Sequence, residues 1–196
     1  MIEGRENGSE LRPGAESRQN ELRIDRVFDA PRELVFRMWS APEFLARWWG
    51  PKGLYLSYCA MDFREGGKWR YCMHQPDGAD YWVSGTYEEI RAPERLSFTW
   101  IGDVGQFSTL VEIDFEDFGG RTLMHFRQAP FPNAEVRDDH DGGWSASFEL
   151  LATYLELYRS GRLTASRLGW RQGEVAGVRP DLPPGIDQGN AAESEN

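Results

Sequence analysis

The feature that most constrains the fold is a long amphipathic helix predicted over Gly143–Tyr158. Large apolar side chains recur there at steps of four, three, four and three residues, which places one set on a single face: Trp144, Phe148, Leu151, Leu155 and Tyr158. Leu150, Tyr154 and Leu157 widen this face. Such a helix must bury its apolar face against another layer of structure, so it is expected to cover a sheet.

The sheet is predicted from runs that alternate between apolar and polar residues. A first strand is expected over Glu21–Phe28, and six more over Leu54–Phe63, Lys68–Gln75, Tyr81–Ile90, Arg95–Ile101, Phe107–Phe115 and Thr122–Gln128. Short turns rich in Gly, Pro and Asp separate the later strands, which makes neighbouring strands antiparallel. One sheet of about seven strands with its helices on one face is an α+β architecture.

Two short helices are expected between the first and second strands. Asp29 is predicted as the N-cap of the first helix, with Pro31 in its first turn. Ala41-Pro42 ends that helix, and the second is expected over Glu43–Trp48.

The hairpin around Glu65-Gly66-Gly67 admits two registers. A three-residue loop would pair Phe63 with Trp69 and Met61 with Tyr71 on the apolar face, and Asp62 with Arg70 on the other. We prefer this register because it keeps apolar and charged side chains on separate faces. On the other strands, alternation predicts an inward set: Val83, Tyr87, Phe98, Trp100, Val111, Ile113, Phe115, Met124, Phe126 and Gln128. Glu112, Asp114, His125 and Arg127 are predicted to point outward.

The chain has 196 residues, which suits one domain with two tails. Residues 1–20 and 161–196 lack apolar periodicity and are expected to be disordered, leaving a domain over 21–160. The formal net charge of −10 argues against nucleic acid and anionic membrane surfaces as partners. With no signal segment or membrane span in view, a cytoplasmic protein is expected, either monomer or homodimer.

The sequence contains no phosphate-binding loop, Cys-x-x-Cys or His-Glu-x-x-His motif, so no cofactor, metal or catalytic residue is predicted. Cys59 and Cys72 fall on opposite faces and are expected to be free, with Cys72 the more reactive. His140 lies four residues before Trp144, on the inward side, where Gln128 could face it. Such a pair could orient a polar group of a ligand or act as a weak acid–base; a partly exposed histidine near a helix start is the simpler interpretation.

A series of motifs in fixed order resembles a known family. The motifs are Arg26–Pro31 with Val35-Phe36, Trp48–Pro51, Asp62–Gly67, Gly85–Ile90, Pro93–Leu96, Phe118–Thr122 and Gly143-Trp144. Together they resemble homologues of the activator of the heat-shock protein 90 ATPase, within the START-like (SRPBCC) superfamily. The resemblance covers residues 21–160 and implies a helix-grip fold, in which a curved antiparallel sheet wraps around a long C-terminal helix with a cavity between them. It implies no set of catalytic residues.

Three functions are compatible with that fold, since fold alone does not determine function. The first is binding of a small hydrophobic or aromatic molecule in the cavity; the others are docking of a chaperone or regulatory protein, and an enzyme of cyclase or hydrolase type. The inward aromatic residues are too bulky to tile a thin core, which favours the first. The predicted ligand-binding residues are Trp39, Trp48, Met61, Trp69, Tyr71, Met73, Tyr87, Phe98, Trp100, Gln128, His140, Trp144, Phe148 and Leu151.

Overall fold

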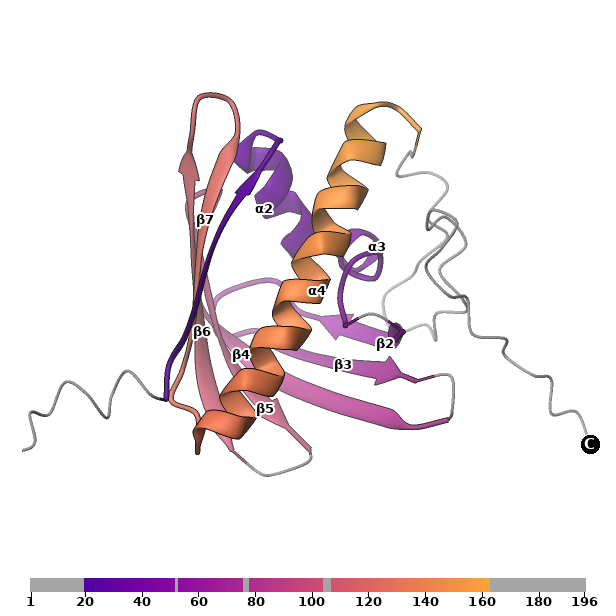
Figure 1. Ribbon diagram of the computed structural model, residues 1–196, viewed down its shortest axis with the longest axis vertical. Helices are drawn as coiled ribbons and strands as arrows, with labels where there is room; N and C mark the ends of the chain where they lie inside the picture. The colour runs from indigo at the N-terminus through magenta and orange to yellow at the C-terminus, as the bar shows by residue number, and fades with distance from the viewer. Residues whose placement is uncertain (1–19, 52, 76–77, 104–106, 163–196) are drawn as a thin grey trace, which may run out of the picture.

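The computed structural model describes residues 20–162 apart from 52, 76–77 and 104–106 (Figure 1). Residues 1–19 and 163–196, which hold nearly all of both predicted tails, lie outside the described residues. The elements follow in the order β1 (Leu22–Phe28), α2 (Arg32–Ser40), α3 (Pro42–Leu45), β2 (Tyr55–Met61), β3 (Lys68–His74), β4 (Asp80–Arg91), β5 (Arg95–Gly102), β6 (Ser108–Asp117), β7 (Thr122–Ala129) and α4 (Ala134–Arg159).

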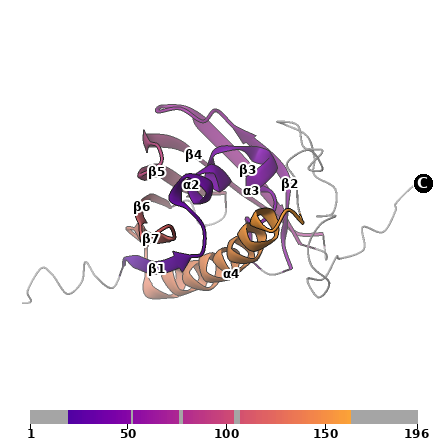
Figure 2. The same cartoon turned by 90° about the horizontal axis from the view of Figure 1, so that it is seen from above.

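The strands form one antiparallel sheet in the order β1-β7-β6-β5-β4-β3-β2. Figure 2 shows this sheet as an arc, with α4 and the two short helices on its inner side. The predicted α+β helix-grip fold, with seven strands and a long C-terminal helix, is confirmed. Because β1 and β2 lie at opposite edges of the sheet, the chain segment containing α2 and α3 has to span its whole width.

The apolar face of α4 is buried as its spacing predicted. Trp144, Phe148, Leu151 and Leu155 are all buried, and Phe148 packs on Phe28 and Phe126 of the two strands at one side of the sheet. The ten inward residues predicted by alternation, from Val83 on β4 to Gln128 on β7, are likewise buried. The core therefore lies between the concave face of the sheet and this helix.

The start of α4 differs from the prediction. The helix begins at Ala134, capped by Asn133, whose side-chain oxygen accepts a hydrogen bond from Val136 N at 2.9 Å. It runs through Gly142-Gly143 without ending there, because the cap and the packing of Trp144 and Phe148 outweigh the low helix propensity of glycine. The extra turns bring His140 to the inner face of the helix.

The two short helices form where they were expected, with different ends. The N-cap of α2 is Pro31, not Asp29, and it makes no side-chain capping bond. The Asp29 carboxylate instead pairs with Arg159, the last residue of α4, at 3.0 Å. Helix α3 covers Pro42–Leu45 and is shorter than the predicted Glu43–Trp48.

The predicted register of the β2–β3 hairpin is wrong by two residues. Met61 pairs with Trp69, and Cys59 pairs with Tyr71. Residues 62–67 form a longer connection that lies against β4, with Gly66 N donating to Tyr87 O at 2.8 Å. Gly66 has a φ of 73°, which favours glycine, and a Cβ on Gly67 would lie 2.0 Å from Asp62 O, so only glycine fits at position 67.

The correction changes the ion pairs of this hairpin. The predicted Asp62–Arg70 pair does not form: Asp62 pairs with Arg64 at 2.8 Å, and Arg70 reaches Asp103 at 3.6 Å. Apolar and polar faces still separate, because a shift of two residues leaves every side chain on its own face.

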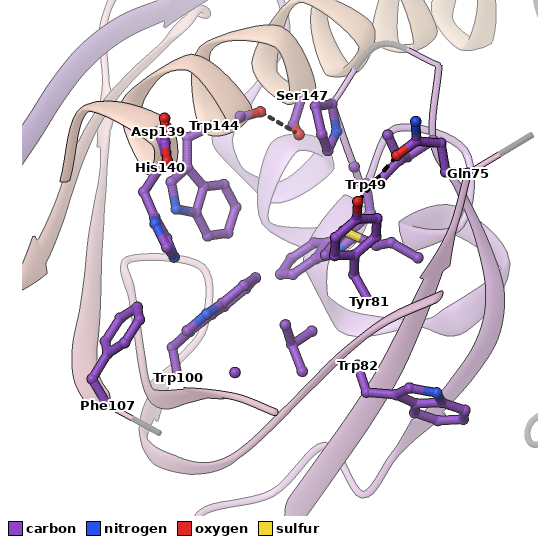
Figure 3. A pocket seen from close by; sticks show the side chains of 17 residues that line it. Trp49, Gln75, Tyr81, Trp82, Trp100, Phe107, Asp139, His140, Trp144 and Ser147 are labelled. Atoms are coloured by element: carbon purple, nitrogen blue, oxygen red, sulfur yellow. Dashed lines mark hydrogen bonds between the residues drawn. The ribbon is translucent and has the colours of Figure 1, made fainter. Parts of the chain in front are cut away.

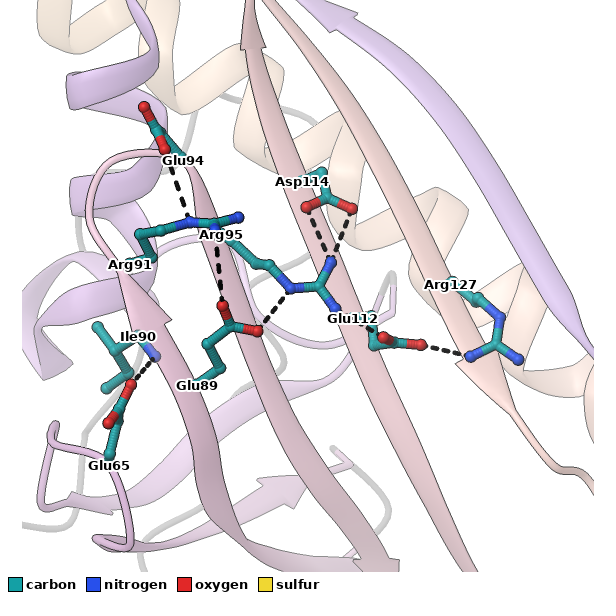
Figure 4. A network of polar contacts seen from close by, with 9 residues as sticks. All are labelled: Glu65, Glu89, Ile90, Arg91, Glu94, Arg95, Glu112, Asp114 and Arg127. Carbon is teal, nitrogen blue, oxygen red and sulfur yellow. Dashed lines mark hydrogen bonds and ion pairs between the residues drawn. The ribbon is translucent and has the colours of Figure 1, made fainter.

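The outer face of the sheet carries a network of ion pairs (Figure 4). Arg95 bonds to both carboxylate oxygens of Asp114 at 2.9 Å and to Glu89 and Glu112 at 2.7 Å. Glu112 also pairs with Arg127, so the network spans β4 to β7. The hydrogen bonds to these carboxylates raise the pKa of the Arg95 guanidinium further above its ordinary value. The outward orientation predicted for Glu112, Asp114 and Arg127 is confirmed.

Candidate functional site

A pocket of about 420 Å³ opens between the first half of α4 and the sheet (Figure 3). Its opposite wall comes from the ends of β3, β4 and β5 and from the segment that follows α3. The lining residues are Trp49, Gly50, Pro51, Leu54, Met73, Gln75, Tyr81, Trp82, Val83, Trp100, Gly102, Phe107, Asp139, His140, Gly143, Trp144 and Ser147. Most of these side chains are aromatic or aliphatic, so the space suits an apolar molecule.

Three tryptophans form the inner wall. The ring of Trp49 stacks on that of Trp100 with centroids 5.7 Å apart, and meets Trp144 edge to face at 5.1 Å. The Trp100 and Trp144 rings are 5.4 Å apart. These contacts hold each ring in place, which gives the pocket a rigid inner wall.

The wall on α4 follows helical spacing. Asp139, Gly143 and Ser147 recur every four residues, and so do His140 and Trp144 one position further on, so all five face the same side. Gly143 leaves a gap in this wall, since a Cβ built there would meet no atom within 4 Å. The absence of a side chain at this position therefore adds to the volume of the pocket.

Buried hydrogen bonds fix the orientation of Trp144. Its indole Nε1 donates to Gln128 Oε1 at 2.7 Å, and Gln128 Nε2 donates to Thr109 Oγ1 at 2.8 Å. Gln128 is fully buried, so its amide is satisfied within the protein. The pairing of Gln128 with His140 that the sequence left open does not form here, because the Gln128 amide bonds to Trp144 and Thr109.

His140 lies at one end of the pocket. Its Nδ1 is 2.9 Å from Val136 O, one turn earlier in the helix. The imidazole packs against Phe131, Phe107 and Trp100, with ring centroids 5.0, 5.7 and 6.1 Å away. Burial lowers the pKa of His140 below its ordinary value of 6.5, against smaller opposing effects of the Val136 carbonyl and the Asp139 charge.

The wall opposite α4 carries a hydrogen-bonded polar pair, Tyr81 and Gln75. The hydroxyl of Tyr81 donates to Gln75 Oε1 at 3.1 Å, and Figure 3 shows both side chains across the pocket from His140. Trp82 is part of the wall through its position on β4, but its indole points away from the pocket in Figure 3. It packs under Arg70 on the outer face, 4.6 Å from the guanidinium carbon.

The predicted binding residues divide into three groups. Met73, Trp100, His140 and Trp144 line the pocket. A second void of about 10 Å³ is lined by Trp39, Trp69, Tyr71, Tyr87 and Phe98, together with Trp49. Trp48, Met61, Gln128, Phe148 and Leu151 are buried in the core and line neither space. A binding role for any of them stays a prediction.

Trp49 separates the two spaces, because its ring contributes to both. On the inner side, the hydroxyls of Tyr71 and Tyr87 are 3.1 Å apart, and burial raises the pKa of both phenols. A void of 10 Å³ is at the lower limit for one water molecule. Side chains therefore fill the middle of the space between α4 and the sheet. The space for a ligand is the pocket beside the first half of α4, near His140.

Several lining residues were missed by sequence reasoning, among them Gln75, Tyr81, Phe107 and Ser147. Ser147 shares the helical spacing of Gly143 and Trp144, so periodicity could have identified it. Gln75, Tyr81 and Phe107 lie at the ends of predicted strands, in step with Met73, Val83 and Val111, so alternation could have identified them as well.

Among the described residues, no group of three or more His, Cys, Asp or Glu side chains is arranged to hold a metal ion. Across the same part of the chain, no helix has both the length and the apolar character needed to cross a membrane.

A curved seven-stranded antiparallel sheet, a long C-terminal helix packed in its concave face and an apolar pocket between them define a START-like helix-grip protein. The family model described as "Activator of Hsp90 ATPase homolog 1-like protein" matches residues 29–156, and the chain belongs to this family. The resemblance seen in the sequence motifs is thereby confirmed. A comparison with curated proteins finds no match.

Solved structures show the same fold. The AHSA1 protein from Silicibacter pomeroyi is 29% identical, with a TM-score of 0.64 over 70% of this chain and 99% of its own. A protein from Chromobacterium violaceum is 26% identical and also has a TM-score of 0.64, over 70% of this chain and 97% of its own. A protein from Arthrobacter aurescens is 25% identical, with a TM-score of 0.64 over 71% and 87%.

Proposed function

We propose that this protein binds a small hydrophobic or aromatic molecule in the pocket between α4 and the sheet. The observation that carries the proposal is the pocket itself. Its volume of about 420 Å³ lies within the range usual for small-molecule sites, and its wall is mainly aromatic and aliphatic with a few polar groups. Membership of a START-like family supports this proposal, because hydrophobic-ligand carriers occur within the superfamily.

The alternatives have less support. On the outer face of the sheet, Arg95 already donates to Glu89, Glu112 and Asp114, so its guanidinium is not available to a protein partner. An enzyme of cyclase or hydrolase type would need polar groups acting together in the pocket. His140 and Tyr81 lie on opposite walls, and each is hydrogen-bonded to a neighbour of its own.

The sequence also predicts a cytoplasmic protein, either monomer or homodimer. These remain proposals, and native mass spectrometry of the purified chain would report the subunit number together with any ligand that copurifies.

Two adjacent glycines allow a matched test of ligand binding. Gly142 and Gly143 lie in the same turn of α4, and a Cβ on either would meet no atom within 4 Å. Only Gly143 lines the pocket. Gly143→Leu should therefore fill part of the pocket, while Gly142→Leu makes the same chemical change outside it.

The probe is N-phenyl-1-naphthylamine, an uncharged aromatic dye whose emission rises in apolar surroundings. We expect saturable binding to the native protein, weakened about tenfold or more in Gly143→Leu, since a leucine side chain would occupy volume that the probe needs. Gly142→Leu should bind like the native protein. Absence of saturable binding to the native protein, or equal weakening in both variants, would contradict the proposed function.

A further inference from the structure

The hydrogen bond of His140 determines which of its nitrogens carries a proton. Nδ1 lies 2.9 Å from the carbonyl oxygen of Val136, and a carbonyl can only accept. Nδ1 must therefore carry the hydrogen. In the neutral imidazole this leaves Nε2 without a proton and with a free lone pair, so Nε2 is a hydrogen-bond acceptor.

The surroundings of the ring keep it neutral. Phe107, Phe131 and Trp100 pack around the imidazole, and removal from water disfavours the charged form. His140 lies between Asp139 and Asp141 in sequence; the charge of Asp139, whose carboxylate is exposed, opposes the effect of burial and is smaller than it. Near neutral pH, His140 is therefore an uncharged acceptor.

Nε2 is available to a ligand. Within the described part of the chain, Nδ1 is the only ring nitrogen of His140 with a hydrogen-bond partner. Figure 3 shows the imidazole projecting from α4 into the pocket, between Trp144 and Phe107 and facing Trp100. A donor brought in by a ligand would reach an acceptor surrounded by aromatic rings, where competition from water is reduced.

Other polar groups on the α4 wall of the pocket can also accept hydrogen bonds. The hydroxyl of Ser147 donates to the carbonyl of Gly143 at 2.8 Å, which leaves its oxygen lone pairs for accepting. Asp139, at the edge of the pocket, presents a carboxylate, which accepts only when ionised. This wall therefore presents acceptors to the ligand.

We propose that Nε2 of His140 accepts a hydrogen bond from the hydroxyl group of an aromatic ligand, so that the pocket selects phenol-like molecules over aromatic molecules without a donor. The inference rests on the proposed function, because it assigns the ligand chemistry of the same pocket. The aromatic wall contacts the ring system of the ligand, and His140 accepts a hydrogen bond from its hydroxyl group. The geometry demands no covalent step.

The test compares two ligands of nearly equal shape, 2-naphthol and 2-methylnaphthalene, each displacing N-phenyl-1-naphthylamine at pH 7. The measured quantity is the ratio of their dissociation constants. His140→Phe keeps a ring and loses both nitrogens. His140→Asn keeps an N–H group for the Val136 carbonyl, but its side chain ends one bond short of Nε2 and so has no acceptor at that position. Asp139→Asn is the control for the neighbouring carboxylate, and thermal unfolding checks that each variant folds.

We expect the native protein to favour 2-naphthol by a ratio about five- to tenfold larger than in His140→Phe or His140→Asn, the size of one neutral hydrogen bond. Asp139→Asn should keep the native ratio. An unchanged ratio in both His140 variants, or a loss of preference in Asp139→Asn alone, would overturn this inference and leave the proposed function intact. If the native protein bound neither naphthalene, both proposals would fail.

Discussion

The indole of Trp144 and the amide of Gln128 join the long helix to the sheet beside the pocket, through an Nε1–Oε1 hydrogen bond of 2.7 Å. Gln128 also donates a hydrogen bond to Thr109 on the neighbouring strand, β6. Trp144 also contacts Trp49 and Trp100, so this bond holds the ring on which the inner wall of the pocket depends.

Gln128→Met should lower the free energy of unfolding by about 2 to 4 kcal/mol, since it leaves the buried Trp144 N–H and Thr109 hydroxyl without partners at a similar packing volume. Urea denaturation measures this quantity. Trp144→Phe should cost less in the Gln128→Met background than in the native protein, because the N–H it removes is already unpaired there. Strictly additive effects would show that this hydrogen bond does not contribute as described.

Gly85 should not tolerate even a methyl group. A Cβ at this position would lie 1.8 Å from the backbone oxygen of Thr99 and 2.8 Å from the Trp69 ring, and the backbone of β5 cannot move away without breaking the ladder. We expect Gly85→Ala to destabilise the fold by more than about 3 kcal/mol. Gly142→Ala is the control, and should be neutral or stabilise by up to about 1 kcal/mol. Similar unfolding midpoints for the two variants would contradict this prediction.

Both cysteines should resist thiol reagents in the folded protein. Cys59 and Cys72 are free and buried, and burial raises the pKa of each thiol. The sequence-based expectation that Cys72 reacts faster does not follow from this structure, because the outer face of β3 is itself covered by side chains around Tyr58 and Trp82. Titration with an aromatic disulfide should release two equivalents only after unfolding in urea. Rapid release of one equivalent from native protein would identify an exposed thiol.

His140 should make stability depend on pH below neutrality. Its folded pKa is lower than the ordinary 6.5, so the unfolded chain binds a proton first as the pH falls. The free energy of unfolding should therefore be unaffected by this residue above pH 6.5 and decrease below it, until the folded pKa is reached. Asp139 is the charged group that acts on the ring, and it opposes the shift.

The difference between native protein and His140→Phe, measured by urea denaturation at several pH values, isolates this contribution. Acid groups that titrate in both proteins cancel in the comparison. A difference that does not change between pH 7.5 and the acid end of the folding range would show that the His140 ring is not held neutral by its surroundings.

The periodic spacing of apolar residues predicted most of the fold, because burying one face of a helix or strand imposes that spacing. The spacing of Trp144, Phe148 and Leu151 on the helix and of Val111, Ile113 and Phe115 on β6 follows from having one face in the core. The β2–β3 register could not be predicted in the same way. Shifting that hairpin by two residues preserves the faces. The choice of register depends on two hydrogen bonds to a third strand, in which Gly66 N donates to Tyr87 O and Tyr87 N donates to Gly67 O.

The position of the pocket was harder to predict than the fold. The sequence indicates a surplus of aromatic rings between sheet and helix, but not where they leave space. Trp39 fills the middle of the space between α4 and the sheet, with its ring centroid 4.6 Å from that of Trp48 and 6.1 Å from that of Trp144. This packing depends on how α2 and α3 approach the sheet, which local patterns do not encode.

The placement of β1 and β2 at opposite edges of the sheet has a consequence for how the protein is made. The first strand to leave the ribosome, β1, pairs only with β7, and Leu22 must wait for Gln128. Each strand from β3 to β7 pairs with the strand before it, so β2 to β7 can assemble in the order of synthesis. Pairing β1 with β7 closes the long loop between Leu22 and Gln128, which costs conformational entropy and slows folding. The earliest strand synthesised is thus the last to be incorporated, and until then the β7 edge of the nascent sheet is open to chaperones or to other chains.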